Sequence, residues 1–160
     1  MALKIVRFAN LLLASVLAGN AVGSVVFVNP ALRTLPTRSH VEAERAITRR
    51  YLPIMRVLMP VTVASCLAQL GLWHERRDST SFRLTLAGTA GFIGMLGVTL
   101  IEIPINRRTL EASPESPPAD WAELRARWER FNLLRTGLEV AGLICLYLGA
   151  LSEAREEARD

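Results

Sequence analysis

The side chains that could do chemistry in this 160-residue chain are carboxylates, amides and arginines spaced one helical turn apart. Glu102 precedes Asn106 by four residues, and Arg135 precedes Glu139 by four. Residues four apart lie on one face of an α-helix, so each pair can point to the same place. A carboxylate can act as a general base, and an arginine can hold a developing oxyanion. These pairs predict a site for proton abstraction and anion binding.

Further side chains could complete such a site. His40 is the second candidate base after Glu102, because the other candidates are amides or permanently protonated arginines. Two tryptophans offer flat apolar surfaces for a ligand. The candidate catalytic residues are Glu102, His40 and Arg135, and the candidate substrate-binding residues are Asn20, Arg56, Asn106, Trp121, Trp128, Asn132 and Glu139.

Familiar motifs of soluble enzymes are absent from the sequence. It contains no phosphate-binding glycine loop, no His-Glu-x-x-His and no nucleophile elbow. Cys66 and Cys145 stand alone in apolar stretches, which is typical of packing residues rather than metal ligands. We therefore expect neither a metal nor a cofactor.

The elements that must position these residues are four long apolar runs. The chain is 51% hydrophobic and has a mean hydropathy of +0.27. Residues 8–28, 57–73 and 84–101 carry no charge, and 131–151 contains only Arg135 and Glu139. About 20 residues suffice for a helix to cross a hydrocarbon core of about 30 Å. We predict one all-α domain over 1–160, a four-helix transmembrane bundle with spans at about 5–28, 52–73, 82–105 and 131–151.

The connections between the spans differ in length. A short polar turn is expected over 74–83. The first long connection is expected to contain a surface helix over 37–50. After the proline-rich segment 113–118, a second surface helix is expected to begin near Asp120 and to run into span four. If neighbouring spans are antiparallel, the two long connections share one side of the membrane, and both termini share the other side with the short turn.

The polar candidates gather near the side of the long connections. Arg56 begins span two, Glu102 and Asn106 end span three, and Arg135 lies in the second turn of span four. At about 1.5 Å per residue, they fall within roughly 12 Å of one interface. This clustering predicts a pocket that opens to that face. Because an unpaired charge inside a membrane is costly, we expect these residues and Asn132 to point inward, with Arg135 paired to a carboxylate.

Charge and composition limit the class of protein. Eighteen of the nineteen basic residues are arginine, and the net charge is +4. They lie at the ends of the apolar runs, so membrane lipid is the expected partner and nucleic acid is not. Lys4 and Arg7 resemble the start of a signal peptide, but the following run is longer than a signal core, and we expect it to be retained. We expect an integral protein of the bacterial inner (plasma) membrane.

Glycines recur at helical spacing in two spans. Such spacing lets two membrane helices approach closely. The glycines expected at helix contacts are Gly19 and Gly23 in span one, and Gly88, Gly91, Gly94 and Gly97 in span three.

Three short patterns resemble a known family. Pro104-Ile105-Asn106 ends span three, and Asn29-Pro30-Ala31-Leu32 follows span one. The segment 121–135 reads W-x3-R-x2-W-x3-N-x2-R. Together these patterns resemble the anthrone oxygenase family of small four-span membrane proteins. The resemblance covers most of the chain, and these patterns are its specific part.

The resemblance implies oxidation of an anthrone-type polyketide to an anthraquinone with molecular oxygen and without a cofactor. An anthrone has an acidic CH2 between two rings, so a base can remove a proton and the resulting anion can pass an electron to oxygen. In this chain the oxyanion would lie on Arg135 and Asn132, and Asn106 would orient the ring oxygens. Trp121 and Trp128 would form the walls of an apolar slot. Some members carry histidine where this chain has Asn132, so the base would be a carboxylate or His40.

Two other classes of function stay open. A small proton-coupled transporter would also use a carboxylate in the membrane, and with four spans it would require a homo-oligomer. A non-catalytic membrane partner or assembly protein would use the polar cluster as a contact between subunits. A planar molecule bound between the helices would favour the enzyme.

Overall fold

The computed structural model describes residues 2–72 and 79–157, and these residues form long helices without a strand. The elements are α1 (Ala2–Gly23), the π-helix η1 (Ser24–Val28), α2 (Asn29–Arg33), α3 (Thr37–Gly71), α4 (Thr80–Glu111) and α5 (Trp121–Glu157). Four stretches are long and apolar enough to cross a membrane, namely Leu3–Arg33, Thr37–Gly71, Thr80–Glu111 and Trp121–Ala154. The prediction of an all-α four-helix membrane bundle is confirmed.

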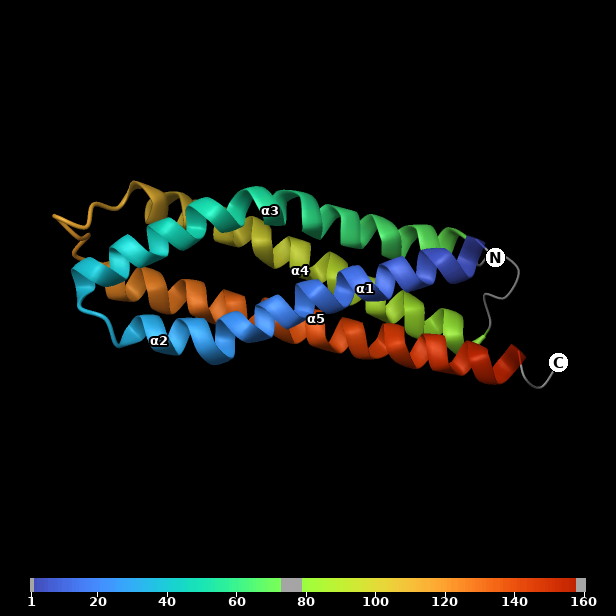
Figure 1. The fold of residues 1–160 in the computed structure, drawn as a ribbon. Coiled ribbons are helices and arrows are strands. Elements are labelled where there is room, and N and C mark those ends of the chain that lie inside the picture. The colour runs from blue at the N-terminus through green and yellow to red at the C-terminus, as the bar shows by residue number, and fades with distance from the viewer. Residues whose placement is uncertain (1, 73–78, 158–160) are drawn as a thin grey trace.

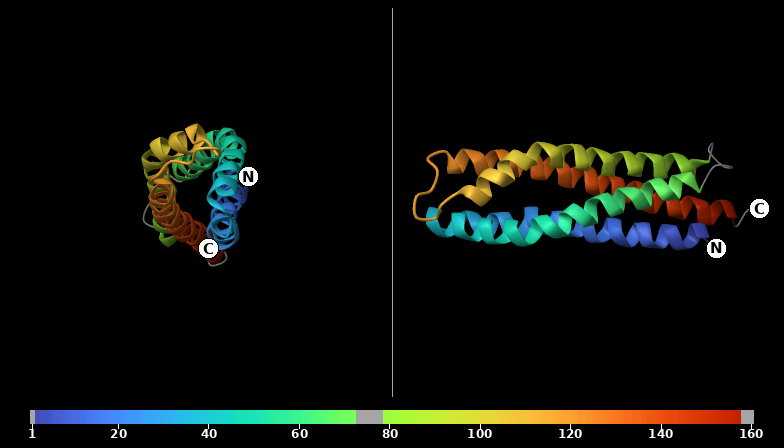
Figure 2. Two further views of the ribbon diagram at one scale, coloured as in Figure 1. Left: turned by 90° about the vertical axis from the view of Figure 1, so that its left-hand side faces the viewer. Right: turned by 90° about the horizontal axis from the view of Figure 1, so that it is seen from above.

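The four long helices alternate in direction and form a ring (Figures 1 and 2). α1 packs against α3 and α5, and α4 packs against the same two helices. The chain between α2 and α3 and the chain between α4 and α5 lie at one end of the bundle, which we call the connection end (Figure 1). Both termini lie at the opposite end (Figure 1). The turn expected over 74–83 falls partly on 73–78, which lie outside the described residues.

The first expected surface helix is not a separate element, and the second runs without a break into span four. Residues 37–50 are helical, but they are the first turns of α3, and residues 121–130 are the first turns of α5. The buried face of α3 continues without a break from residues 37–50 into the following membrane-spanning residues. Burial of this face therefore favours a single helix. That face is formed by Val41, Glu44, Thr48, Met55 and Met59.

The closest helix contact joins α4 to α5 through glycine. A Cβ atom on Gly91 would lie 2.9 Å from the carbonyl oxygen of Leu138 and 3.1 Å from the Cα atom of Gly142. A Cβ atom on Gly88 would likewise lie 2.8 Å from the carbonyl oxygen of Gly142. The absence of side chains therefore lets the two backbones meet, as predicted for these two positions.

The other predicted glycine contacts are different. Among the described residues, a Cβ atom on Gly19, Gly23 or Gly97 would meet no atom beyond its own stretch of helix within 4 Å. Gly94 would make only ordinary contact with the Leu138 side chain, at 3.4 Å. The prediction of close packing at these positions was wrong because recurrence in sequence does not reveal which helical face meets a neighbour.

Gly91→Ala is expected to destabilise the bundle by about 1–3 kcal/mol, because the new methyl group would meet backbone that cannot move aside cheaply. Gly97→Ala is the matched control on the same helix, and it should leave stability unchanged or slightly raised. The measurement is the free energy of unfolding in detergent micelles. Equal losses for both variants would contradict the assigned α4–α5 contact.

Candidate functional site

A cavity of about 520 Å³ lies between the helices in the half of the bundle next to the connection end. Met55, Met59 and Leu96 line its deep part, while Glu44 and Leu110 lie towards the connection end. Apolar atoms make up most of the surface of its wall. This volume is within the range of small-molecule sites. The polar and charged wall residues are Ser24, Asn29, Glu44, Thr48, Tyr51, Arg56, Thr99, Glu102, Asn106, Arg107, Trp128 and Arg135.

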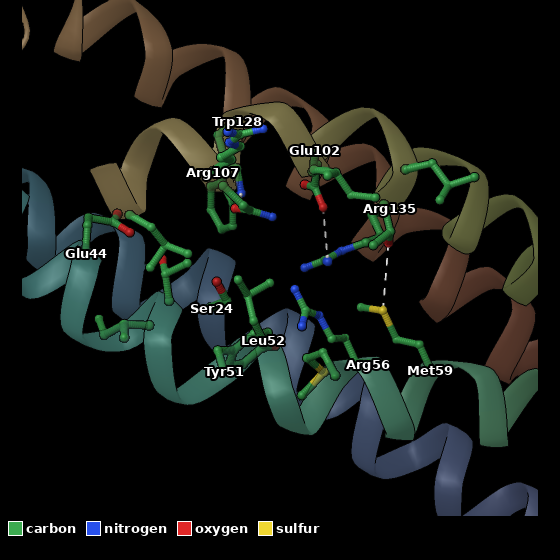
Figure 3. Close-up of a pocket in the computed structure, with 18 of the residues that line it drawn as sticks. Ser24, Glu44, Tyr51, Leu52, Arg56, Met59, Glu102, Arg107, Trp128 and Arg135 are labelled. Atoms are coloured by element: carbon green, nitrogen blue, oxygen red, sulfur yellow. Dashed lines mark hydrogen bonds and ion pairs between the residues drawn. The ribbon is translucent and has the colours of Figure 1, made fainter. Parts of the chain in front are cut away.

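A buried ion pair forms the centre of the polar wall. Glu102 is fully buried, and its Oε2 atom accepts a hydrogen bond from Arg135 Nη1 at 3.1 Å (Figure 3). Its other oxygen, Oε1, is buried without a hydrogen-bond partner among the described residues. Arg135 also donates from Nη2 to Asn132 Oδ1 at 2.8 Å. The pairing of Arg135 with a carboxylate is as predicted, and one carboxylate oxygen of Glu102 has no hydrogen-bond partner in the part of the chain that the structure describes.

Glu139 lies on the other side of the same arginine. Its Oε1 atom is 3.7 Å from Arg135 Nε, and its side chain is fully buried. Glu139 is not part of the cavity wall. Both carboxylates point inward and neither faces lipid, as the pocket hypothesis required.

A change in helix winding brings polar groups from span one to the site. The N–H of Asn29 donates to the carbonyl of Ser24, five residues back, instead of four. This wide turn directly precedes Pro30, which has no N–H to donate. Ser24 then accepts a hydrogen bond from Asn132 Nδ2 at 3.4 Å and donates to Asn29 Oδ1 at 3.5 Å. The network therefore links α5, η1 and α2.

Arg56 reaches the cavity from α3, opposite Arg135 (Figure 3). The two guanidinium groups point towards the same space (Figure 3). Within residues 2–72 and 79–157, Arg56 has no ion-pair or hydrogen-bond partner. Its positive charge is therefore available to a ligand.

One of the two predicted tryptophans belongs to the wall. Trp128 lines the cavity and donates from Nε1 to Asn106 Oδ1 at 2.9 Å, which fixes the ring and the amide together. Trp121 is instead buried in a separate apolar cluster with Val41 and Ile105. Trp121 therefore lies outside the wall of this cavity, whereas the resemblance predicted it in the wall of the slot.

Glu44 belongs to the site, although it is not among the site residues predicted from the sequence. Glu44 lines the cavity, and its Oε1 atom lies 2.5 Å from Arg125 Nη2. His40 Nε2 lies 3.6 Å from the same oxygen, but His40 itself does not line the cavity. The Arg125 guanidinium also lies over the Trp128 ring, 4.4 Å from its centroid. The available signal was the spacing of four residues between His40 and Glu44, which places both on one face of α3.

The structure brings half of the predicted site residues to the cavity. Asn132 is buried behind Arg135 and positions it, and Asn20 lies on the exposed side of α1. Asn20 misses the cavity because Leu17 and Ala21 occupy the inward face of α1, and it accepts a hydrogen bond from the Tyr51 hydroxyl. The predicted residues in the wall are Arg56, Glu102, Asn106, Trp128 and Arg135, and those outside it are Asn20, His40, Trp121, Asn132 and Glu139.

Arg125→Ala is expected to cost about 3 kcal/mol of stability, because Glu44 would keep a buried charge without its partner. Arg108→Ala is the control, since it removes an exposed ion pair with Asp120 at 2.9 Å and should cost less than about 1 kcal/mol. The measurement is again the free energy of unfolding in micelles. An equally small loss for Arg125→Ala would mean that Glu44 is neutral or solvated.

Comparison with known proteins gives one match. The model of the anthrone oxygenase family matches residues 50–145. No curated protein and no solved structure matches the chain. The matched residues include Arg56, Glu102, Asn106, Trp128 and Arg135, whereas Ser24, Asn29 and Glu44 come from the part before the match.

Proposed function

We propose that this chain, which belongs to the anthrone oxygenase family, oxidises a planar aromatic substrate with molecular oxygen inside the cavity between its four membrane helices. The observation that carries the proposal is how the two carboxylate oxygens of Glu102, a residue of the cavity wall, are hydrogen-bonded. One of its oxygens is bound to Arg135, and the other has no hydrogen-bond partner among the described residues. A carboxylate held in place with one vacant oxygen is suited to act as a general base.

The proposed reaction begins with proton transfer. Glu102 Oε1 removes a proton from the CH2 between the two rings of an anthrone, and the negative charge spreads to the ring oxygen. Arg135 is the candidate to stabilise that oxygen, because Glu102 and Asn132 hold its guanidinium in place before the substrate binds. The electron-rich anion then passes one electron to O2, giving a carbon radical and superoxide.

The remaining steps balance without a further reductant. The radical and superoxide combine with a proton into a hydroperoxide at the former CH2 carbon. Loss of water from this hydroperoxide leaves a carbonyl group. One oxygen atom of O2 therefore ends in the anthraquinone, and the other leaves as water together with the two hydrogens of the CH2 group.

The wall of the cavity supports a planar apolar substrate. Trp128 presents an aromatic surface, and its hydrogen bond to Asn106 prevents the ring from rotating. Met55, Met59 and Leu96 make the deep part apolar, and a low local dielectric strengthens the electrostatic interactions with the developing anion.

The test is oxygen consumption by the purified protein in detergent with a hydroxylated anthrone. The expected result is a rate well above that of the spontaneous oxidation and of heat-inactivated protein. A rate equal to the spontaneous one would contradict the proposal for that substrate. Isotope labelling with 18O2 should place one labelled atom in each quinone molecule.

The chain is an integral membrane protein by its four apolar helices. Location in a bacterial inner membrane stays a prediction, as do self-association and the alternative functions of proton-coupled transport and subunit assembly. Assembly through the polar cluster is disfavoured because Glu102 and Glu139 are both fully buried within one chain.

A further inference from the structure

We propose that the ligand enters the cavity sideways from the lipid bilayer, between α3 and α4, and that it carries an anionic oxygen that Arg56 binds. The inference rests on the proposed function in taking the ligand to be a planar aromatic molecule. It adds the route by which that ligand enters the cavity and the negative charge that the ligand carries.

The wall of the cavity reaches the outer surface on α4. Leu100 and Ile103 both line the cavity, yet 66% and 54% of their surfaces are exposed. A residue that is at once wall and outer surface marks the edge of an opening. Both residues belong to Thr80–Glu111, a helix long and apolar enough to cross a membrane, so we place this surface in lipid. On α3, Arg56 and Pro60 are likewise exposed wall residues.

Two prolines lie beside this opening. Pro60 on α3 and Pro104 on α4 have no N–H, so the carbonyls of Arg56 and Leu100 cannot accept the usual hydrogen bond from four residues ahead. Prolines within helices produce bends. On the opposite side, α4 is held against α5 by the contacts at Gly88 and Gly91. We place the opening on the α3–α4 side, where the two most exposed large hydrophobic residues of the wall lie.

Arg56 stands at this opening with its charge unmatched. Arg107, the other exposed arginine of the wall, pairs with Glu111 at 2.9 Å, and Arg135 pairs with Glu102 at 3.1 Å. Arg56 has no such partner among the residues that the structure describes. A lone guanidinium at membrane depth is costly, and a carboxylate, phenolate or enolate oxygen of a ligand would supply its partner.

The charge of the ligand is tested with a fluorescent probe, anthracene-9-carboxylate, and its uncharged methyl ester. The protein is placed in nanodiscs of zwitterionic lipid, and the dissociation constant of each probe is measured. We expect the acid to bind about tenfold tighter than the ester, which is the effect of one charge-assisted contact. Arg56→Gln should abolish this preference. Arg49→Gln, an exposed arginine of α3 outside the cavity wall, should keep it.

The route is tested by the association rate of probe already dissolved in the bilayer. Leu100→Trp should narrow the opening and slow association about tenfold, or 1.4 kcal/mol in the barrier. Leu133→Trp, on an exposed part of α5 outside the wall, should leave the rate unchanged. If Leu110→Trp slows entry and Leu100→Trp does not, the ligand enters from the connection end and the lateral route is wrong.

Further outcomes separate this inference from the proposed function. Arg56-dependent binding of the probe without any oxygen uptake from anthrone would support the inference and contradict the oxygenase. Equal binding of acid and ester by the wild type would contradict the role of Arg56 whatever the oxygen uptake. Displacement of the acid by phosphatidylglycerol in the nanodiscs would identify a lipid headgroup as the anion and overturn the proposal of a small organic acid.

Discussion

Replacing Glu102 by Gln is expected to lower the rate of oxygen uptake with an anthrone by about a hundredfold or more, the usual effect of removing a general base. The substitution keeps the size of the side chain and removes its ability to accept a proton. Glu102 lines the cavity, and its Oε1 atom is buried without a hydrogen-bond partner among the described residues. The measurement is the initial rate in an oxygen electrode, corrected for the spontaneous reaction.

Glu139→Gln is the matched comparison for this variant. Glu139 also lies beside Arg135 and is equally buried, but it does not line the cavity. Its substitution removes the same charge near the same arginine, so we expect a loss of less than about tenfold. If both variants lose activity equally, Glu102 acts only through the charge of Arg135 and is not the base.

Replacing Arg135 by Gln is expected to lower the rate by about a hundredfold to a thousandfold, as for loss of an oxyanion-binding group. Arg135 is the wall residue that contacts both Glu102 and Asn132, so its guanidinium is fixed before the substrate arrives. Arg135→Lys keeps the charge but lacks the forked guanidinium whose two nitrogens reach Glu102 and Asn132, so it should recover part of the activity.

For variants of Arg135, a loss of stability must be separated from a loss of catalytic rate. Loss of Arg135 leaves Glu102 buried without its cation, which also costs stability. The rates are therefore compared at a temperature where each variant remains folded by circular dichroism. Arg130→Gln, an exposed residue of the same helix outside the wall, should retain the wild-type rate. Full activity of folded Arg135→Gln would remove this residue from the mechanism.

The four spans could be predicted because their cause is local. Backbone N–H and C=O groups in lipid must be hydrogen-bonded within the protein. The uncharged run over 8–28 and the similar runs that follow achieve this by forming helices. The ends of the helices were less predictable. Nothing in the sequence near Tyr51 distinguishes a helix that ends at the membrane surface from one that continues, and the buried face of α3 decides in favour of continuation.

Part of the site was predictable for a related reason. Glu102 and Arg135 are ionisable residues near the ends of apolar runs, and their cost in lipid requires an inward position and a partner. The position of Asn20 was not predictable, because a polar amide can lie on either face of a helix near the interface. Glu44 was missed because it lies in a charged segment where one buried carboxylate cannot be distinguished from its exposed neighbours.

The central claim is that a planar substrate binds between the four helices with its reacting carbon at Glu102. The most direct measurement is the structure of the Glu102→Gln protein in lipid nanodiscs with a hydroxylated anthrone under anaerobic conditions. We expect density for the ligand in the cavity, with its CH2 group against residue 102 and a ring oxygen within about 3.2 Å of the Arg135 guanidinium. An empty cavity, or a ligand bound only on the outer lipid-facing surface, would contradict it.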